Sequence, residues 1–171
     1  SIGLNLFMKF LKNAVDKKRN FKEVDEIELP VFELDENMGI PENFIPDIEA
    51  RLQIYQEMSL VYQISNLEDL KEIYEDRFGE LPEPFLNLFK YQQIKILAYR
   101  IGVKNLNLNE KNCVIKFDFE VFGLTNLIKK LTKYDLKING NNIRIFGGIN
   151  IEELYDFLTR ILELKSNLIT N

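Results

Sequence analysis

The stretch IYEDRFGELPEPFLNLF, residues 73–89, contains the end of one helix, a tight turn and the start of another. Gly79 is the residue type that most often ends a helix, because glycine adopts a left-handed backbone without steric cost. The sequence Leu-Pro-Glu-Pro at 81–84 then resets the chain direction, and proline is favoured in a first helical turn. The pattern predicts two helices, over residues 65–79 and 84–101.

Apolar residues at helical spacing predict two further helices before this stretch, over residues 3–19 and 46–63. Pro46 and Asp47 suit the first turn of the second one. The acidic segment between these helices is extended, and Pro30 allows at most an edge strand there. Ser65 or Asn66 is expected to cap the 65–79 helix. Its predicted buried stripe is Leu67, Leu70, Ile73, Tyr74 and Phe78.

After residue 102 the apolar period changes from helical to alternating. Residues 103–119 predict a β-hairpin, and residues 136–146 predict a second one with Asn139-Gly140 as its turn signal. Helices are expected over about 122–134 and 150–165. The sequence therefore predicts an α+β fold, in which three N-terminal helices are followed by a ββαββα unit with a small antiparallel sheet.

The composition is typical of a soluble globular protein, with 171 residues, 46% hydrophobic and 29% charged. The absence of histidine excludes a Ser-His or Cys-His nucleophile pair and a His/Cys zinc site. The lone cysteine, Cys113, lies in an alternating stretch, which predicts a small buried apolar residue. A single cysteine cannot form an internal disulfide, which fits a cytoplasmic protein. No glycine-rich loop has phosphate-binding spacing. We expect no enzymatic activity, no cofactor, no metal and no membrane span in this chain.

Charge is unevenly distributed along the sequence. Residues 23–83 carry eighteen acidic residues against Arg51, Lys71 and Arg77. Such a segment repels phosphate backbones and suits a basic protein partner, although it is also explained by solvated surfaces. The competing functions are a DNA-binding appendage and a stand-alone hydrolase. The acidic balance argues against the first, and the missing catalytic groups argue against the second.

Three stretches together resemble the C-terminal domain of bacterial transcription-repair coupling factor: IPENFIPDIEARLQIYQ (40–56), LEDLKEIYEDRFGELPEPFLNLF (67–89) and QQIKILAYRIGVKNL (92–106). Residues 2–15 are also similar to the stretch that closes the translocase module of that family. The residues at matching motif positions are Ile45, Pro46, Asp47, Arg51, Leu52, Tyr55, Asp76, Arg77, Phe78, Gly79, Pro82 and Pro84.

The resemblance implies a regulatory role. Members of the family are ATP-driven double-stranded-DNA translocases that remove stalled RNA polymerase and recruit the UvrA repair protein. Their C-terminal domain packs on a UvrB-like module, covers its UvrA-binding surface and autoinhibits the protein. On this basis residues 1–20 would end the translocase module, residues 21–43 would form an extended acidic linker, and residues 44–171 would form the regulatory domain. Direct contact with nucleic acid is not expected.

The predicted partner interface is the helix and turn within residues 67–83. Asp76 is assigned to it by motif position, whereas Glu72, Glu75 and Glu80 are added by proximity and helical spacing. Arg77 is hypothesised to brace the turn or an internal carboxylate such as Asp47. The residues assigned to structure are Pro46, Asp47, Arg51, Arg77, Phe78, Gly79 and Pro82.

Overall fold

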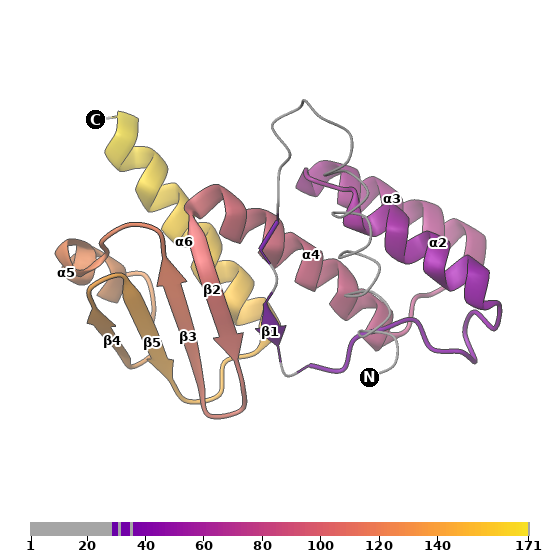
Figure 1. The fold of residues 1–171 in the computed structure, drawn as a ribbon, viewed down its shortest axis with the longest axis horizontal. Coiled ribbons are helices and arrows are strands. Elements are labelled where there is room, and N and C mark those ends of the chain that lie inside the picture. Colours follow the sequence, from indigo (N-terminus) through magenta and orange to yellow (C-terminus); the bar gives the residue numbers. More distant parts are fainter. Residues whose placement is uncertain (1–28, 31, 35, 171) are drawn as a thin grey trace, which may run out of the picture. The chain divides into compact units, whose positions relative to one another are not determined.

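The computed structural model describes residues 29, 30, 32–34 and 36–170 (Figure 1). The helix predicted for residues 3–19 lies outside the described residues. The chain divides into a helical unit, described here over residues 37–93, and a sheet unit that combines residues 29–36 with residues 94–171. The division falls inside α4 (Glu83–Ile101), which contributes to both units. The domain boundaries expected at residues 20 and 43 stay predictions.

The helical unit contains α2 (Ile48–Ser59), α3 (Ile64–Phe78) and the first part of α4. Asp47 precedes α2, and its carboxylate caps the helix by accepting a hydrogen bond of 3.1 Å from the Glu49 N–H. The helix ends four residues earlier than the sequence predicts. The N–H groups of Leu60 and Val61 bond to carbonyls only three residues back, which tightens and closes the last turn.

The predicted cap of α3 is wrong. The helix begins at Ile64 behind Gln63, which makes no side-chain capping bond. The N–H of Leu67 bonds to the Gln63 carbonyl, so Ser65 and Asn66 already lie inside the first helical turn. Both side chains are exposed there.

The turn between α3 and α4 confirms the prediction that Gly79 ends the first of these helices. This glycine has φ of +89°, and a Cβ added to it would meet nothing within 4 Å. Backbone conformation, and not lack of space, therefore selects glycine. The Pro82 carbonyl then accepts bonds from Phe85 and Leu86 as α4 begins. Aromatic rings from α3, α4 and the loop before α2 pack together behind the turn, namely Phe44, Tyr74, Phe78, Phe85 and Phe89.

The sheet unit has five strands in the order β1-β2-β3-β5-β4. They are β1 (Glu33–Leu34), β2 (Val103–Leu108), β3 (Asn112–Phe117), β4 (Leu136–Asn139) and β5 (Asn142–Phe146). Both predicted hairpins are confirmed as antiparallel pairs, β2 with β3 and β4 with β5. The second turn lies one residue later than expected, at Gly140-Asn141, because Asn139 is still in β4 and pairs with Asn142. The sheet is mixed, and not wholly antiparallel as expected, because β1 adds to β2 in parallel. The segment around Pro30 thus supplies an edge strand, as predicted.

The two remaining helices differ in length from their predictions. The region 122–134 forms only a 3₁₀ turn (Phe122–Leu124) and α5 (Thr125–Lys129). The helix stops there because Lys130 and Leu131 bond three residues back, and the Thr132 hydroxyl accepts the Tyr134 N–H in a local turn. By contrast α6 (Ile151–Thr170) is longer than predicted. None of the described helices is long and apolar enough to cross a membrane.

One face of the sheet is buried, and α6 lies behind it (Figure 1). Inward side chains such as Cys113, Ile115 and Ile143 are fully buried, and so are Leu154 and Leu158 of α6. Cys113 is a buried free thiol, as predicted, and burial raises its pKa to about 12. The alternate residues of the same strands point away from this core.

Candidate protein-interaction site

The predicted interface acids occupy the last part of α3 and the turn after it. Glu72 and Asp76 lie four residues apart, on one side of the helix, and both are exposed. Glu80 is exposed just beyond Gly79. Glu75 is half-buried, with its carboxylate 3.7 Å from the Lys71 ammonium. The structure thus brings Glu72 and Asp76 onto one surface and places Glu75 in a local ion pair.

An apolar side chain that the sequence analysis placed in the core lies on this acidic surface. Ile73 is 56% exposed, so its assignment to the buried stripe is wrong. It lies about 100° around the helix from Tyr74, whose side chain is buried. Asp69, Glu72 and Asp76 are its neighbours one residue or one turn away and are all exposed. We call Asp69, Glu72, Ile73 and Asp76 the α3 surface.

A partly buried hydrogen bond fixes the orientation of α3. The Tyr74 hydroxyl donates to Glu57 of α2 over 2.6 Å. Burial is the main cause that raises the pKa of Tyr74, and the bond to the Glu57 carboxylate raises it further. Because Tyr74 faces inward and is held to α2, the α3 surface faces the solvent in the helical unit. Nothing in the sequence pattern identified Glu57 as the partner.

Arg51 lies in α2 and bonds to the motif that precedes this helix. Its side chain is buried, and Nη1 donates to the Ile45 carbonyl at 2.7 Å and to the Pro46 carbonyl at 3.0 Å. Its other terminal nitrogen lies 3.9 Å from Glu42, which is exposed. Arg51 therefore holds the loop that carries Asp47 against the helix that Asp47 caps.

Arg77 does not brace Asp47. Its guanidinium lies over the ring of Phe78, 4.8 Å from the ring centroid, whereas the Asp47 carboxylate bonds to its own helix. Arg77 is exposed, and Phe78 joins the aromatic cluster behind Gly79. A basic group thus lies at one end of the α3 surface, one turn beyond Ile73.

The described part of the helical unit is strongly acidic. Residues 37–93 contain eleven acidic and four basic residues, a net charge of −7. The described residues include no group of three His, Cys, Asp or Glu side chains that could hold a metal ion. The α3 surface combines negative charge with one exposed aliphatic side chain. This combination suits contact with another protein.

The fold and this surface define a small mixed α/β domain with an acidic helical part. A family model described as the TRCF domain matches residues 34–122. The chain belongs to this family. Its fold is also similar to a crystal structure of the C-terminal domain of transcription-repair coupling factor, with a TM-score of 0.68 and 20% sequence identity. That match covers 81% of this chain and 94% of the other.

The curated relatives that this chain matches include transcription-repair-coupling factors. The protein of Escherichia coli (strain K12) is 33% identical over 121 residues, which cover 68% of this chain and 10% of that relative. The protein of Buchnera aphidicola subsp. Acyrthosiphon pisum (strain APS) is 30% identical over 174 residues, covering 98% of this chain and 21% of the relative. The chain therefore spans about a tenth to a fifth of the length of these relatives.

Proposed function

We propose that this chain is a non-catalytic regulatory domain of a transcription-repair coupling factor. In this proposal it packs on the UvrB-like module of the longer protein, masks the UvrA-binding surface of that module and holds the protein in an autoinhibited state. Contact with UvrA and RNA polymerase would be indirect, through the other modules. Membership of the TRCF domain family supports a place in a transcription-repair coupling factor. The acidic and apolar side chains of the α3 surface support a contact with a basic partner surface.

The observation that carries the proposal is the exposure of Ile73 among Asp69, Glu72 and Asp76. In the free domain, the aliphatic side chain of Ile73 is exposed to water and the acids around it repel one another. A basic partner surface would bury the aliphatic side chain and pair with the acids. The rest of α3 is anchored through Tyr74. The helix can therefore present these side chains without rearranging, which lowers the cost of binding.

Exposed charge pairs also suit a contact that has to be released. They contribute modest free energy and weaken as ionic strength rises. A competing partner or a small conformational change can therefore shift the equilibrium between masked and open states.

The test is calorimetric titration of this domain against the separately produced UvrB-like module, at low and at physiological salt. We expect binding that weakens with salt. Asp76→Lys should reduce the affinity about tenfold, because it opposes like charges across the interface. Ile73→Ala should reduce it about fivefold, as expected for the apolar centre of a contact.

Two matched variants control for general effects. Asp156→Lys makes the same charge change at an exposed position on α6, and Ile48→Ala truncates another isoleucine that is about half exposed. Neither should change the affinity. Equal losses in test and control variants would refute an interface on α3.

Tethering in one chain could make the contact too weak to see between separate pieces. The second measurement is therefore UvrA binding to the full-length protein. Asp76→Lys should increase it, and no change in either experiment would refute masking. Incubation of the domain with ATP tests the non-catalytic part of the proposal, for which we expect no hydrolysis above the blank.

A further inference from the structure

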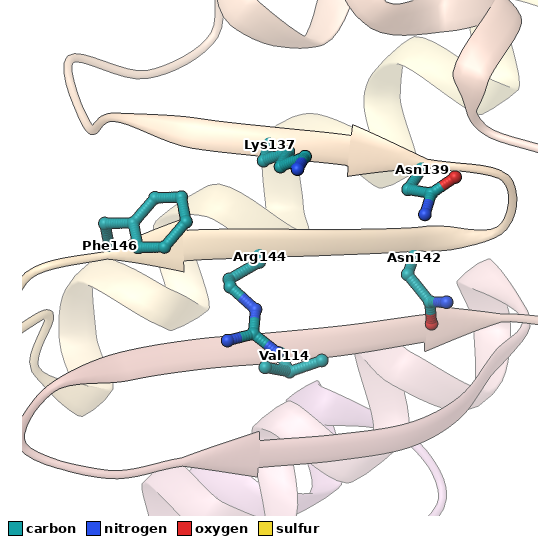
Figure 2. A pocket seen from close by; sticks show the side chains of 6 residues that line it. All are labelled: Val114, Lys137, Asn139, Asn142, Arg144 and Phe146. Atoms are coloured by element: carbon teal, nitrogen blue, oxygen red, sulfur yellow. The ribbon is translucent and has the colours of Figure 1, made fainter.

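The open face of the sheet contains a hollow that the proposed masking role does not use. It has a volume of about 420 Å³ and is lined by three strands, β3, β4 and β5 (Figure 2). Phe146 lies at one end of it, and Asn139 and Asn142 lie at the other, where β4 turns into β5. The lining residues are Val114, Lys137, Asn139, Asn142, Arg144 and Phe146.

The strand register places two cations opposite each other in this hollow. Lys137 of β4 pairs with Arg144 of β5, and Arg144 pairs on its other side with Val114 of β3. Like charges on directly opposed residues of a sheet are destabilising. Within the described residues, neither of these cationic side chains makes a hydrogen bond or an ion pair. The arrangement therefore favours a bound anion between them.

One further cation lies beside the hollow: Lys116 is exposed at the next outward position of β3 and pairs with Asn142. The acids nearest in sequence are Asp135, just before β4, Glu110, in the β2–β3 turn, and Asp118, just after β3. Asp135 and Glu110 belong to the end of the sheet where Phe146 lies, and the backbone N–H of Asp118 bonds to Gly102 beyond the other end of β3. On β1, Glu33 accepts a hydrogen bond from Asn107 at the opposite edge.

Phe146 adds an apolar platform beside the cations. Its ring is 41% exposed, although it ends a strand whose inward residues are fully buried. Arg144 lies two residues away on the same face, about 7 Å along the strand. That spacing fits one nucleotide, with its base stacked on the ring and its phosphate at the guanidinium. The amides of Asn139 and Asn142 each offer a donor and an acceptor for a neighbouring base edge.

We propose that this hollow binds single-stranded DNA, with one base on Phe146 and the adjacent phosphates at Arg144 and Lys137. An acidic peptide would use the cations but would leave the exposed ring without a stacking partner. A duplex keeps its bases stacked inside and cannot offer one to the ring. The two amides of the lining, Asn139 and Asn142, are assigned to a base edge, which leaves no side chain of the hollow assigned to a ribose 2′-OH, and the proposal is therefore stated for DNA.

This proposal departs from the expectation that the chain makes no direct contact with nucleic acid. That expectation was based on the acidic balance of residues 23–83. Residues 94–171 carry twelve basic and eight acidic residues, a net charge of +4. The charge that a DNA strand meets is the local charge of the sheet face. The proposal does not depend on masking by the α3 surface.

The experiment is fluorescence anisotropy of a labelled twelve-nucleotide oligothymidylate titrated with the whole chain at several salt concentrations. Phe146→Ala should weaken binding at least about fivefold, the loss typical of one base–aromatic stack. Lys137→Gln with Arg144→Gln should lower the slope of log affinity against log salt by about 0.7 per cation removed. All three residues are exposed, so circular dichroism and thermal unfolding should be unchanged.

The matched controls are Phe122→Ala and Lys129→Gln. They remove an exposed phenylalanine and an exposed lysine that do not line the hollow, and they should leave binding unchanged. The proposal is overturned if the oligonucleotide does not bind at 50 mM salt, or if the controls weaken binding as much as the test variants. It is also overturned if polyglutamate displaces the DNA while Phe146→Ala has no effect. Tighter binding of oligouridylate than of oligothymidylate would overturn the choice of DNA.

Discussion

The helical unit and the sheet unit differ in charge and in the way they are held together. Residues 37–93 have a net charge of −7, whereas the sheet unit has a net charge of +1, because Glu33, Asp35 and Glu36 offset part of the +4 of residues 94–171; the whole-chain value of −5 conceals this difference. In both units side chains bond to main-chain carbonyls, as Arg51 does with Ile45 and Pro46 in the helical unit and Lys165 with Ile101 in the sheet unit. The sheet unit adds a main-chain ladder between its strands, whereas the helical unit relies on a buried arginine to hold a loop. The comparison teaches that an averaged charge is a poor guide to partners.

The largest effect should come from the buried arginine of the helical unit. Arg51→Met leaves the Ile45 carbonyl without its buried donor and should lower the free energy of unfolding by about 2 kcal/mol. Hydrogen exchange followed by mass spectrometry would locate the loss, which we expect in residues 41–60. Arg160→Met is the control in the sheet unit, because Arg160 is exposed and bonds to a single carbonyl. If both variants cost the same, the contrast between the units fails.

A smaller effect is expected at Gly79 of the helical unit, and Gly123 of the sheet unit is the comparison. Gly79→Ala forces a side chain onto a backbone with φ of +89° and should cost about 1 to 2 kcal/mol. Gly123 also has open space where the methyl group of an alanine would lie, but its φ is outside the left-handed region, so Gly123→Ala should cost almost nothing. Urea unfolding of both variants measures the difference. An equal cost would mean that packing, and not backbone conformation, decides at residue 79.

The smallest effect is a pH dependence that belongs to the sheet unit. Burial raises the pKa of Cys113 to about 12, so the folded state keeps the thiol proton after the unfolded state loses it near pH 8.5. The contribution of the thiol is therefore complete below about pH 8.5 and is lost as pH rises toward 12, by about 1 kcal/mol at pH 9.5. Burial of Lys95 lowers its pKa to about 7 and acts in the opposite direction over this range.

The measurement compares the wild-type chain with Cys113→Ala by urea unfolding at pH 7.5 and pH 9.5. The difference between the two proteins isolates the thiol, because Lys95 is present in both. We expect the wild-type chain to lose about 1 kcal/mol more than the variant on going to the higher pH. Parallel changes in the two proteins would contradict a buried, protonated Cys113.

The sequence predicts the parts of the fold that local chemistry controls. Gly79 ends α3 and Gly140 lies in the β4–β5 turn, and both have the positive φ that favours glycine, although the turn itself is Gly140-Asn141 and not the predicted Asn139-Gly140. The parallel pairing of β1 with β2 could not be predicted in this way. It joins residues that are 74 positions apart, as the bond from Asn107 to Glu33 illustrates, and the two-residue strand has no period of its own.

Only part of each candidate site could be predicted from the sequence. Glu72 and Asp76 could be placed on one surface from their spacing, but Ile73 was assigned to the core because an apolar residue beside a helical stripe is ambiguous until the packing partners are known. For the hollow, the alternation of Lys137, Asn139, Asn142, Arg144 and Phe146 with buried residues was present in the sequence. The opposition of Lys137 and Arg144 depended on the register, which the turn sets: a turn at Asn139-Gly140 would have paired Lys137 with Asn142, whereas the observed turn at Gly140-Asn141 pairs it with Arg144.

The position of β4 at the end of the sheet has a consequence for solubility. An outer strand presents unpaired main-chain groups that can recruit a strand from another molecule and begin aggregation. Here that strand is only four residues long and carries Lys137 at an exposed position. The short strand offers few main-chain groups for pairing. The lysine opposes pairing between copies, because a second molecule would bring its own lysine close to the first. The lysine that we assign to DNA binding therefore also protects the sheet from edge-to-edge association.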